Sequence, residues 1–221
     1  MLTVLTSLAA FALAGALSSV PVSVTIMILL SPAPRRSALP FLAGALAGST
    51  AVVGLSALGL HAAPVRPALD GAAFPAFLGI LAGGALVVYA VYLISTRTRG
   101  GTGRMERVQG KFASSRGWKY AVLGVGLNLR PKAILLAVAA GAVIGVRNAA
   151  PVEGSALVLA YAVVAQSAVV APIAFWLHAP ERSQVYLGRV SAWLQRNGRT
   201  VTGAAALFIG IFLAGYNLLR L

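Results

Sequence analysis

Two basic residues, Arg130 and Lys132, lie inside an otherwise apolar segment that is long enough to cross a membrane. At 1.5 Å per helical residue, counting from Trp118 places Arg130 about 18 Å into the membrane. A basic residue at that depth costs at least about 2.5 kcal/mol, so it needs a compensating partner. All four acids of the chain lie in predicted loops. We therefore expect backbone carbonyls, Asn128 and water to solvate the cations and an anionic substrate to complete their neutralisation; a register nearer the interface is the alternative.

Two prolines, Pro21 and Pro131, interrupt apolar segments in comparable positions of the chain. A proline inside a helix frees the carbonyl four residues earlier, which is Leu17 for Pro21 and Leu127 for Pro131. Helix breaks in matching positions of two repeats predict a substrate site near the middle of the membrane. Two proline kinks without function are the alternative. The predicted substrate-binding residues at these breaks are Arg130, Lys132, Asn128, Pro131, Pro21, Ser18, Ser19 and Ser23.

The other reactive residues give no sign of catalysis or of a bound metal or cofactor. The chain has no cysteine, which excludes disulfides, thiolate nucleophiles and cysteine-metal sites. His61 and His178 are predicted at opposite membrane faces, so they cannot share a metal ion. Nucleophile elbows, paired carboxylates and nucleotide-binding motifs are missing from the sequence. We expect neither enzymatic activity, nor a metal, nor a cofactor.

The composition is that of an integral membrane protein. Of 221 residues, 59% are hydrophobic and 10% are charged, and the mean hydropathy is +0.87. Six apolar segments can each cross the roughly 30 Å hydrocarbon layer, which takes about 20 helical residues. No basic residue precedes the first segment, so we expect a retained helix rather than a signal peptide. The segments are Met1 to Pro34, Ser37 to Leu60, Gly71 to Thr96, Lys119 to Val146, Gly154 to Leu177 and Thr200 to Leu219.

The basic residues are sorted between alternate loops, which argues against nucleic-acid binding despite a formal net charge of +14. Lysine and arginine gather in the first, third and fifth loops, and such loops remain in the cytoplasm. Both termini are therefore predicted outside the cytoplasm. A basic cytoplasmic face also attracts anionic phospholipid of the membrane.

The fifth loop, near residues 181–199, is predicted to form an amphipathic helix on the membrane surface. Its three arginines recur every seven residues, and four apolar or aromatic residues are expected on another face. A simple anchor and a lipid-headgroup docking surface are the two alternatives. The arginines are Arg182, Arg189 and Arg196, and the other four residues are Tyr186, Val190, Trp193 and Leu194.

Three segments precede the most basic loop and three follow it, so an internal repeat must have inverted topology. We predict an all-α integral membrane protein with six transmembrane helices in a 3+3 inverted repeat, with helices 1 and 4 broken at Pro21 and Pro131. Residues 1–96 form the first unit, 97–117 the basic cytoplasmic loop and 118–221 the second unit. The fifth segment contains Tyr161, Gln166 and Pro172. Either these residues form hydrogen bonds between helices and a kink, or they line the cavity.

Small residues predict how the helices pack, because close backbone approach stabilises helix pairs in lipid. Three GxxxG pairs are expected to lie inside the bundle, with a dimer interface as the alternative. They are Gly44/Gly48, Gly79/Gly83 and Gly141/Gly145.

Two stretches carry a family resemblance. A first helix rich in small residues ends in ALSSVPV at residues 16–22, and GLNLRPKAILL follows the basic loop at residues 126–136. This layout resembles the GAP-like family, the glycopeptidolipid- and sulfolipid-addressing membrane proteins of actinobacteria, within the lysine-exporter superfamily. Members commonly show Asn-Pro-Lys in the fourth helix. Here Leu129 and Arg130 separate Asn128 from the Pro131-Lys132 pair, which carries over.

The resemblance implies a flippase-like transporter of the bacterial cytoplasmic membrane that moves or exports a cell-envelope lipid. The expected substrate is an anionic lipid or lipid-linked glycan, and a homodimer or a complex with envelope-lipid machinery is possible. Two alternatives stay open: an amino-acid or small-solute exporter of the lysine-exporter type, and a non-transporting scaffold for lipid synthesis or secretion. A cationic solute would require intramembrane carboxylates, and the predicted segments contain none.

Overall fold

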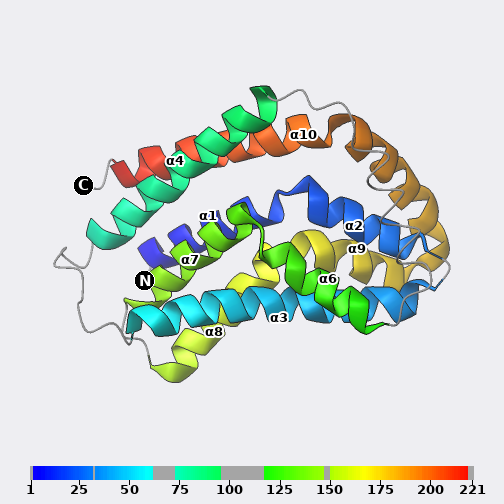
Figure 1. Cartoon of the computed structure of the whole chain (residues 1–221), viewed down its shortest axis with the longest axis horizontal. Coiled ribbons are helices and arrows are strands. Elements are labelled where there is room, and N and C mark those ends of the chain that lie inside the picture. Colours follow the sequence, from blue (N-terminus) through cyan, green and yellow to red (C-terminus); the bar gives the residue numbers. More distant parts are fainter. Residues whose placement is uncertain (1, 32, 62–72, 96–116, 147–149, 219–221) are drawn as a thin grey trace.

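The computed structural model describes residues 2–31, 33–61, 73–95, 117–146 and 150–218, and their regular structure is entirely helical (Figure 1). The predicted basic loop at 97–117 lies outside these residues except for Gly117. The helices are α1 (Leu2–Ala16), α2 (Ser19–Leu29), α3 (Pro34–His61), α4 (Ala73–Ser95), α6 (Trp118–Asn128), α7 (Pro131–Gly145), α8 (Pro151–Ala165), α9 (Ser167–His178) and α10 (Pro180–Leu218).

Length and apolar composition make several of these helices candidate membrane spans. Residues Pro34–Gly59 of α3 and Arg196–Gly215 of α10 can each cross a membrane alone. Three bent pairs qualify as broken spans: α1 with α2, α6 with α7, and α8 with α9. Helix α4 carries a shorter described apolar stretch, Ile80–Tyr92. The prediction of an all-helical protein with membrane-spanning helices is confirmed. Among the described residues these helices and pairs give up to five candidate spans, and the apolar stretch of α4 is shorter than a span.

The two predicted helix breaks are present, with bends of 55° between α1 and α2 and 71° between α6 and α7. Each proline lies in the first turn of the helix that follows the break, where a missing backbone N–H costs no hydrogen bond. Pro131 is the first residue of α7, whereas Pro21 is the third residue of α2. The extended residues that separate the helices are Ser18 and Arg130. The breaks are therefore 112 residues apart, two more than the prolines.

A third break, which the sequence did not predict, separates α8 from α9 by a bend of 69°. It lies at Gln166, which ends α8 and precedes α9. Pro172, the expected site of a kink, lies inside α9 instead. All three breaks fall between two apolar cores, one built around Phe11, Leu136 and Val158 and the other around Ile26, Phe41 and Val169.

Glycines allow the helices to approach each other at backbone distance. A Cβ on Gly44 of α3 would overlap the Ala121 carbonyl of α6, and a Cβ on Gly141 of α7 would lie 2.6 Å from the Val53 carbonyl of α3. A Cβ on Gly83 of α4 would lie 2.7 Å from the Gly210 carbonyl of α10. The expectation that these glycines pack inside the bundle is confirmed. The surroundings of Gly79 lie outside the described residues.

Helix α10 joins the predicted surface segment and the last span in one helix of 39 residues. Figure 1 shows α10 curving around one end of the bundle before it runs beside α4. The face assignment differs from the prediction: Val190 and Leu194 pack against the core, whereas Tyr186 and Trp193 remain exposed. Only one narrow face of this part of α10 contacts the core, and both aromatic residues lie outside that face.

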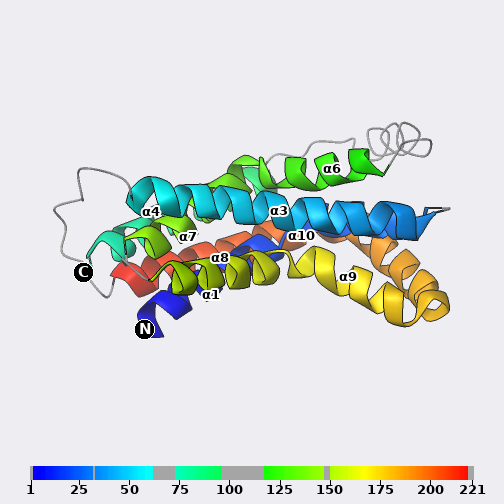
Figure 2. The same ribbon diagram turned by 90° about the horizontal axis from the view of Figure 1, so that it is seen from below.

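The two ends of the molecule differ in charge. Figures 1 and 2 both place the start of α1 and the end of α10 at the same end. The opposite end carries the starts of α3, α6 and α10. Its exposed basic residues are Arg35, Arg36, Lys119, Arg182 and Arg189. Among the residues that the structure describes, the terminal end carries Glu153 and no lysine or arginine.

Adjacent glycines on α4 provide a matched test of the close contact between α4 and α10. Gly83→Ala is expected to destabilise the protein by about 1–3 kcal/mol, because its Cβ would meet the α10 backbone. Gly84→Ala should be neutral or slightly stabilising, because its Cβ would meet open space and alanine favours helix. Thermal unfolding in detergent, followed by circular dichroism, measures both. Equal stability of the two variants would contradict the contact.

Candidate functional site

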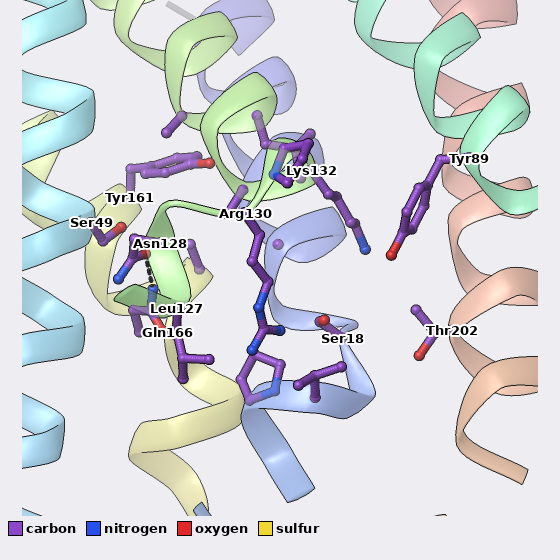
Figure 3. A pocket seen from close by; sticks show the side chains of 18 residues that line it. Ser18, Ser49, Tyr89, Leu127, Asn128, Arg130, Lys132, Tyr161, Gln166 and Thr202 are labelled. Carbon is purple, nitrogen blue, oxygen red and sulfur yellow. Dashed lines mark hydrogen bonds between the residues drawn. The ribbon is translucent and has the colours of Figure 1, made fainter. Parts of the chain in front are cut away.

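A cavity of about 390 Å³ lies at the level of the three helix breaks (Figure 3). Its lining comes from α1, α2, α3, α4, α6, α7, α8 and α10 and from the residues at the breaks. The polar lining residues are Ser18, Ser49, Tyr89, Asn128, Arg130, Lys132, Tyr161, Gln166 and Thr202. The predicted breaks thus meet at one polar site.

The position of Ser49 gives the depth of this cavity. Ser49 lies 15 residues after Pro34 and 12 residues before His61, the two ends of α3. At 1.5 Å per residue, both helix ends are about 18–22 Å away. Ser49, and with it this wall of the cavity, is therefore near the middle of α3, and a substrate site at mid-membrane stays a prediction.

Arg130 and Lys132, which flank Pro131 in the sequence, both line the cavity. Lys132 Nζ donates a hydrogen bond of 3.4 Å to the carbonyl oxygen of Leu17, which is the carbonyl that Pro21 was predicted to free. In Figure 3 the Arg130 side chain extends toward Ser18 and the Lys132 side chain toward Tyr89. Both cations are partly buried. The expected hydrogen bond between a freed carbonyl and a cation is present for Lys132.

No acidic residue lines the cavity, and in the part of the chain that the structure describes neither Arg130 nor Lys132 forms an ion pair. The first turns of α2 and α7 also border the cavity, through Pro21 and Lys132. The N-terminus of a helix carries a partial positive charge and free N–H groups, which stabilise an anion. The last turns of α1, α6 and α8 border the cavity as well, through Gly15, Asn128 and Ala165, and helix C-termini carry the opposite partial charge. The two cations, in a lining without an acidic residue, therefore make the site suited to a negatively charged group.

Asn128 has partners other than the cations that it was expected to solvate. Its Nδ2 group donates to the carbonyl oxygens of Ala45 at 2.9 Å and Gly124 at 3.2 Å. Its Oδ1 atom accepts a hydrogen bond of 2.7 Å from Nε2 of Gln166. Because Asn128 is 6% exposed and both of its amide protons are engaged, it links α3, α6 and the break after α8. It holds the cavity wall in place.

The structure brings six of the eight predicted site residues to the cavity. Ser23 is half-buried and does not line it, and the side chain of Ser19 lies outside what the structure describes. Thr25, near the same break, is fully buried and donates a hydrogen bond of 2.7 Å to the Pro21 carbonyl. The six lining residues are Ser18, Pro21, Asn128, Arg130, Pro131 and Lys132.

Several residues that line the cavity are not among the predicted site residues. Ser49, Tyr89 and Thr202 are polar residues of α3, α4 and α10 that no motif marks. Hydrogen bonding between helices and a place in the cavity lining are the two predicted alternatives for Tyr161 and Gln166, and Gln166 does both. Polar residues in apolar segments were the available signal.

Metal binding finds no support in the described residues, because no three His, Cys, Asp or Glu side chains among them come together to hold an ion. The predicted absence of a cofactor stays a prediction.

An all-helical membrane bundle with a central cationic cavity is the class that fold and site define. The chain belongs to the SfLAP family, described as "Sap, sulfolipid-1-addressing protein", whose model matches residues 8–217. The resemblance to the GAP-like proteins is thereby confirmed. No curated protein and no solved structure matches the chain significantly.

The bond between Asn128 and Gln166 can be measured with a double-mutant cycle. We expect Asn128→Ala and Gln166→Ala to destabilise the protein non-additively, with a coupling of about 0.6–1.7 kcal/mol, because each removes the same hydrogen bond. Reversible unfolding in mixed micelles gives the free energies of the single and double variants. Ser23→Ala, outside the cavity, serves as a control and should not couple to Gln166→Ala. Additive effects would show that the bond contributes nothing.

Proposed function

We propose that this protein translocates or exports an anionic cell-envelope lipid or glycolipid across the bacterial cytoplasmic membrane. The observation that carries the proposal is the pair of cations, Arg130 and Lys132, in a mid-bundle cavity to which no acidic residue contributes. An anionic headgroup supplies the charge that the lining lacks. The family is named for the addressing of a sulfolipid, which agrees with a lipid substrate.

The size of the cavity favours a headgroup rather than a whole lipid. A volume of about 390 Å³ lies within the usual range for small-molecule sites, and a pair of acyl chains would need far more. In this mechanism the chains stay in the surrounding bilayer, where they are already at low free energy. Only the headgroup enters the polar interior, where Arg130 and Lys132 hold it by charge-assisted hydrogen bonds.

The packing of the helices supports a six-span, 3+3 inverted repeat of lysine-exporter type. Helix α3 packs on α6 and α7, and correspondingly the pair α8 and α9 packs on α1 and α2. Helices α4 and α10 pack on each other, with Gly83 and Gly210 in mutual contact. Exchange of the two halves converts the first of these contacts into the second and the α4–α10 contact into itself, as a two-fold axis in the membrane plane requires.

Orientation follows from the charged end of the molecule. The positive-inside rule places the end with Arg35, Lys119 and Arg189 in the cytoplasm. Both termini then lie outside. The cavity, near the middle of α3, would take up a headgroup from one leaflet and release it to the other.

Relative motion of two helix groups is the simplest way to open the cavity alternately. Tyr89 and Thr202 come from α4 and α10, and the other polar lining residues come from the remaining helices. The glycine contact keeps α4 and α10 together as one unit. Rocking this unit against the others exposes the cations first to one side and then to the other.

Reconstitution into liposomes tests the headgroup role of the two cations. Arg130→Gln and Lys132→Gln are each expected to slow the movement of labelled anionic lipid roughly 10- to 100-fold, the loss typical of one charge-assisted hydrogen bond. Lys119→Gln removes an exposed cation from the same segment and should leave the rate unchanged. A fluorescence assay with a leaflet-impermeant quencher measures anionic phospholipid and a polyprenyl-phosphate glycolipid in parallel.

The same vesicles separate the alternatives. Unchanged lipid movement in both variants removes the headgroup role. Uptake of amino acids without lipid movement would identify a small-solute exporter. Movement of neither, with normal folding, would favour a scaffold.

Because the chain has no cysteine, the proposed rocking can be tested by chemical cross-linking. A cleavable bifunctional maleimide that joins Ser18→Cys on one wall to Thr202→Cys on the other should stop lipid movement, and cleavage should restore it. Singly substituted proteins treated with the same reagent show how much the label itself inhibits. Full transport with the cross-link in place would contradict the motion.

A further inference from the structure

The first part of α10, residues 180–195, precedes the apolar span that begins at Arg196. It packs against α2 and α9 at the basic end of the bundle. Its inward face packs against the bundle: Ser183 and Leu187 are buried, and Val190 and Leu194 contact the core. Ser183 Oγ donates to the Pro180 carbonyl at 2.8 Å.

The outward face carries arginines and aromatic residues in alternation. Arginines seven residues apart lie within about 20° of each other on a helix, and an aromatic residue follows two of them at four-residue spacing. All five side chains are exposed, Tyr186 at 63% and Trp193 at 52%. We name this surface the arginine–aromatic stripe; it consists of Arg182, Tyr186, Arg189, Trp193 and Arg196.

One aromatic contact and one exposed apolar side chain define the surroundings of the stripe. The Tyr186 ring meets the Phe175 ring of α9 edge-on at a centroid distance of 6.2 Å, and Phe175 is itself 45% exposed. Val185, beside the stripe, is 62% exposed. The one acidic residue of α10 is Glu181 in its first turn, so the stripe keeps a net positive charge.

The continuity of α10 sets the depth of the stripe. Because the apolar span begins at Arg196, the residues before it lie where the hydrocarbon layer ends. Tyrosine and tryptophan concentrate at that level, and arginine there extends its guanidinium to lipid phosphates while its stem stays in apolar surroundings.

We propose that the arginine–aromatic stripe binds the anionic headgroups of phospholipids in the surrounding leaflet, which act as bound neighbours and not as transported substrate. Three cations complement the phosphates, and the exposed rings and Val185 match the acyl-glycerol region beside them. An acidic protein partner would be complemented by the arginines but would leave this apolar surface unexplained. The proposal is independent of the cavity.

Lipid titration of the purified full-length protein in mixed micelles tests the proposal. Phosphatidylglycerol, but not phosphatidylcholine, should raise the thermal unfolding temperature in a saturable way. The triple variant Arg182→Gln, Arg189→Gln, Arg196→Gln should shift the midpoint to a roughly 100-fold higher lipid fraction, about fivefold for each arginine at the membrane surface. The matched control Arg35→Gln, Arg36→Gln, Lys119→Gln loses the same charge from the same end and should keep the midpoint.

Both triple variants are also compared in an Arg130→Gln, Lys132→Gln background, so that lipid bound in the cavity cannot contribute. A midpoint unaffected by the stripe substitutions overturns the proposal, and so does an equal loss in the matched control. A similar temperature shift with soluble glycerol phosphate would point to free anion binding and would also overturn it. Lipid movement in liposomes is measured separately, so failure of the cavity hypothesis leaves this result interpretable.

Discussion

Backbone groups released at three helix breaks in an apolar environment are the constraint on which the rest of the site depends. In a membrane there is no solvent to hydrogen-bond such groups, and each one left unpaired costs several kcal/mol. Here one freed carbonyl, that of Leu17, accepts a hydrogen bond from Lys132, a residue 115 positions away in the chain. The break after α8 is tied to the break after α6 by Gln166 and Asn128. Because the polar side chains that form these hydrogen bonds lie at one level of the bundle, they line a polar cavity there.

The same constraint explains which features could be predicted from the sequence. Pro21 and Pro131 mark their breaks through local chemistry, and Arg130 and Lys132 are conspicuous because a cation in an apolar segment is costly. The break at Gln166 has no proline beside it, so the local sequence does not mark it. Its side chain forms a tertiary hydrogen bond to Asn128, which no local pattern encodes. Ser49, Tyr89 and Thr202 converge only through packing between helices distant in sequence.

Glycines hold two pairs of helices around the cavity at backbone distance. Gly44 and Gly124 bring α3 and α6 to backbone contact, and Gly83 and Gly210 do the same for α4 and α10. Close packing of this kind makes each pair a stiff unit, because side chains that could slide or repack are missing from the interface. A cavity whose lining is divided between such units changes shape when the units move. In the proposed mechanism, the stiffness within the α4–α10 pair lets it move as one unit against the other helices.

The charge of the cavity and its place in the membrane together favour a lipid over a free ion. A small dissolved anion and a lipid headgroup both lose hydration on entering this site, and Arg130, Lys132 and the polar lining replace part of it. Under the proposed function, a lipid keeps its acyl chains in the bilayer, which already suits them, and only its headgroup would exchange water for Arg130, Lys132 and the hydroxyl groups of the lining. The cost of desolvation is then limited to the part of the substrate that carries the charge. A cationic solute gains nothing from this site, because the lining has no acidic residue to replace its hydration.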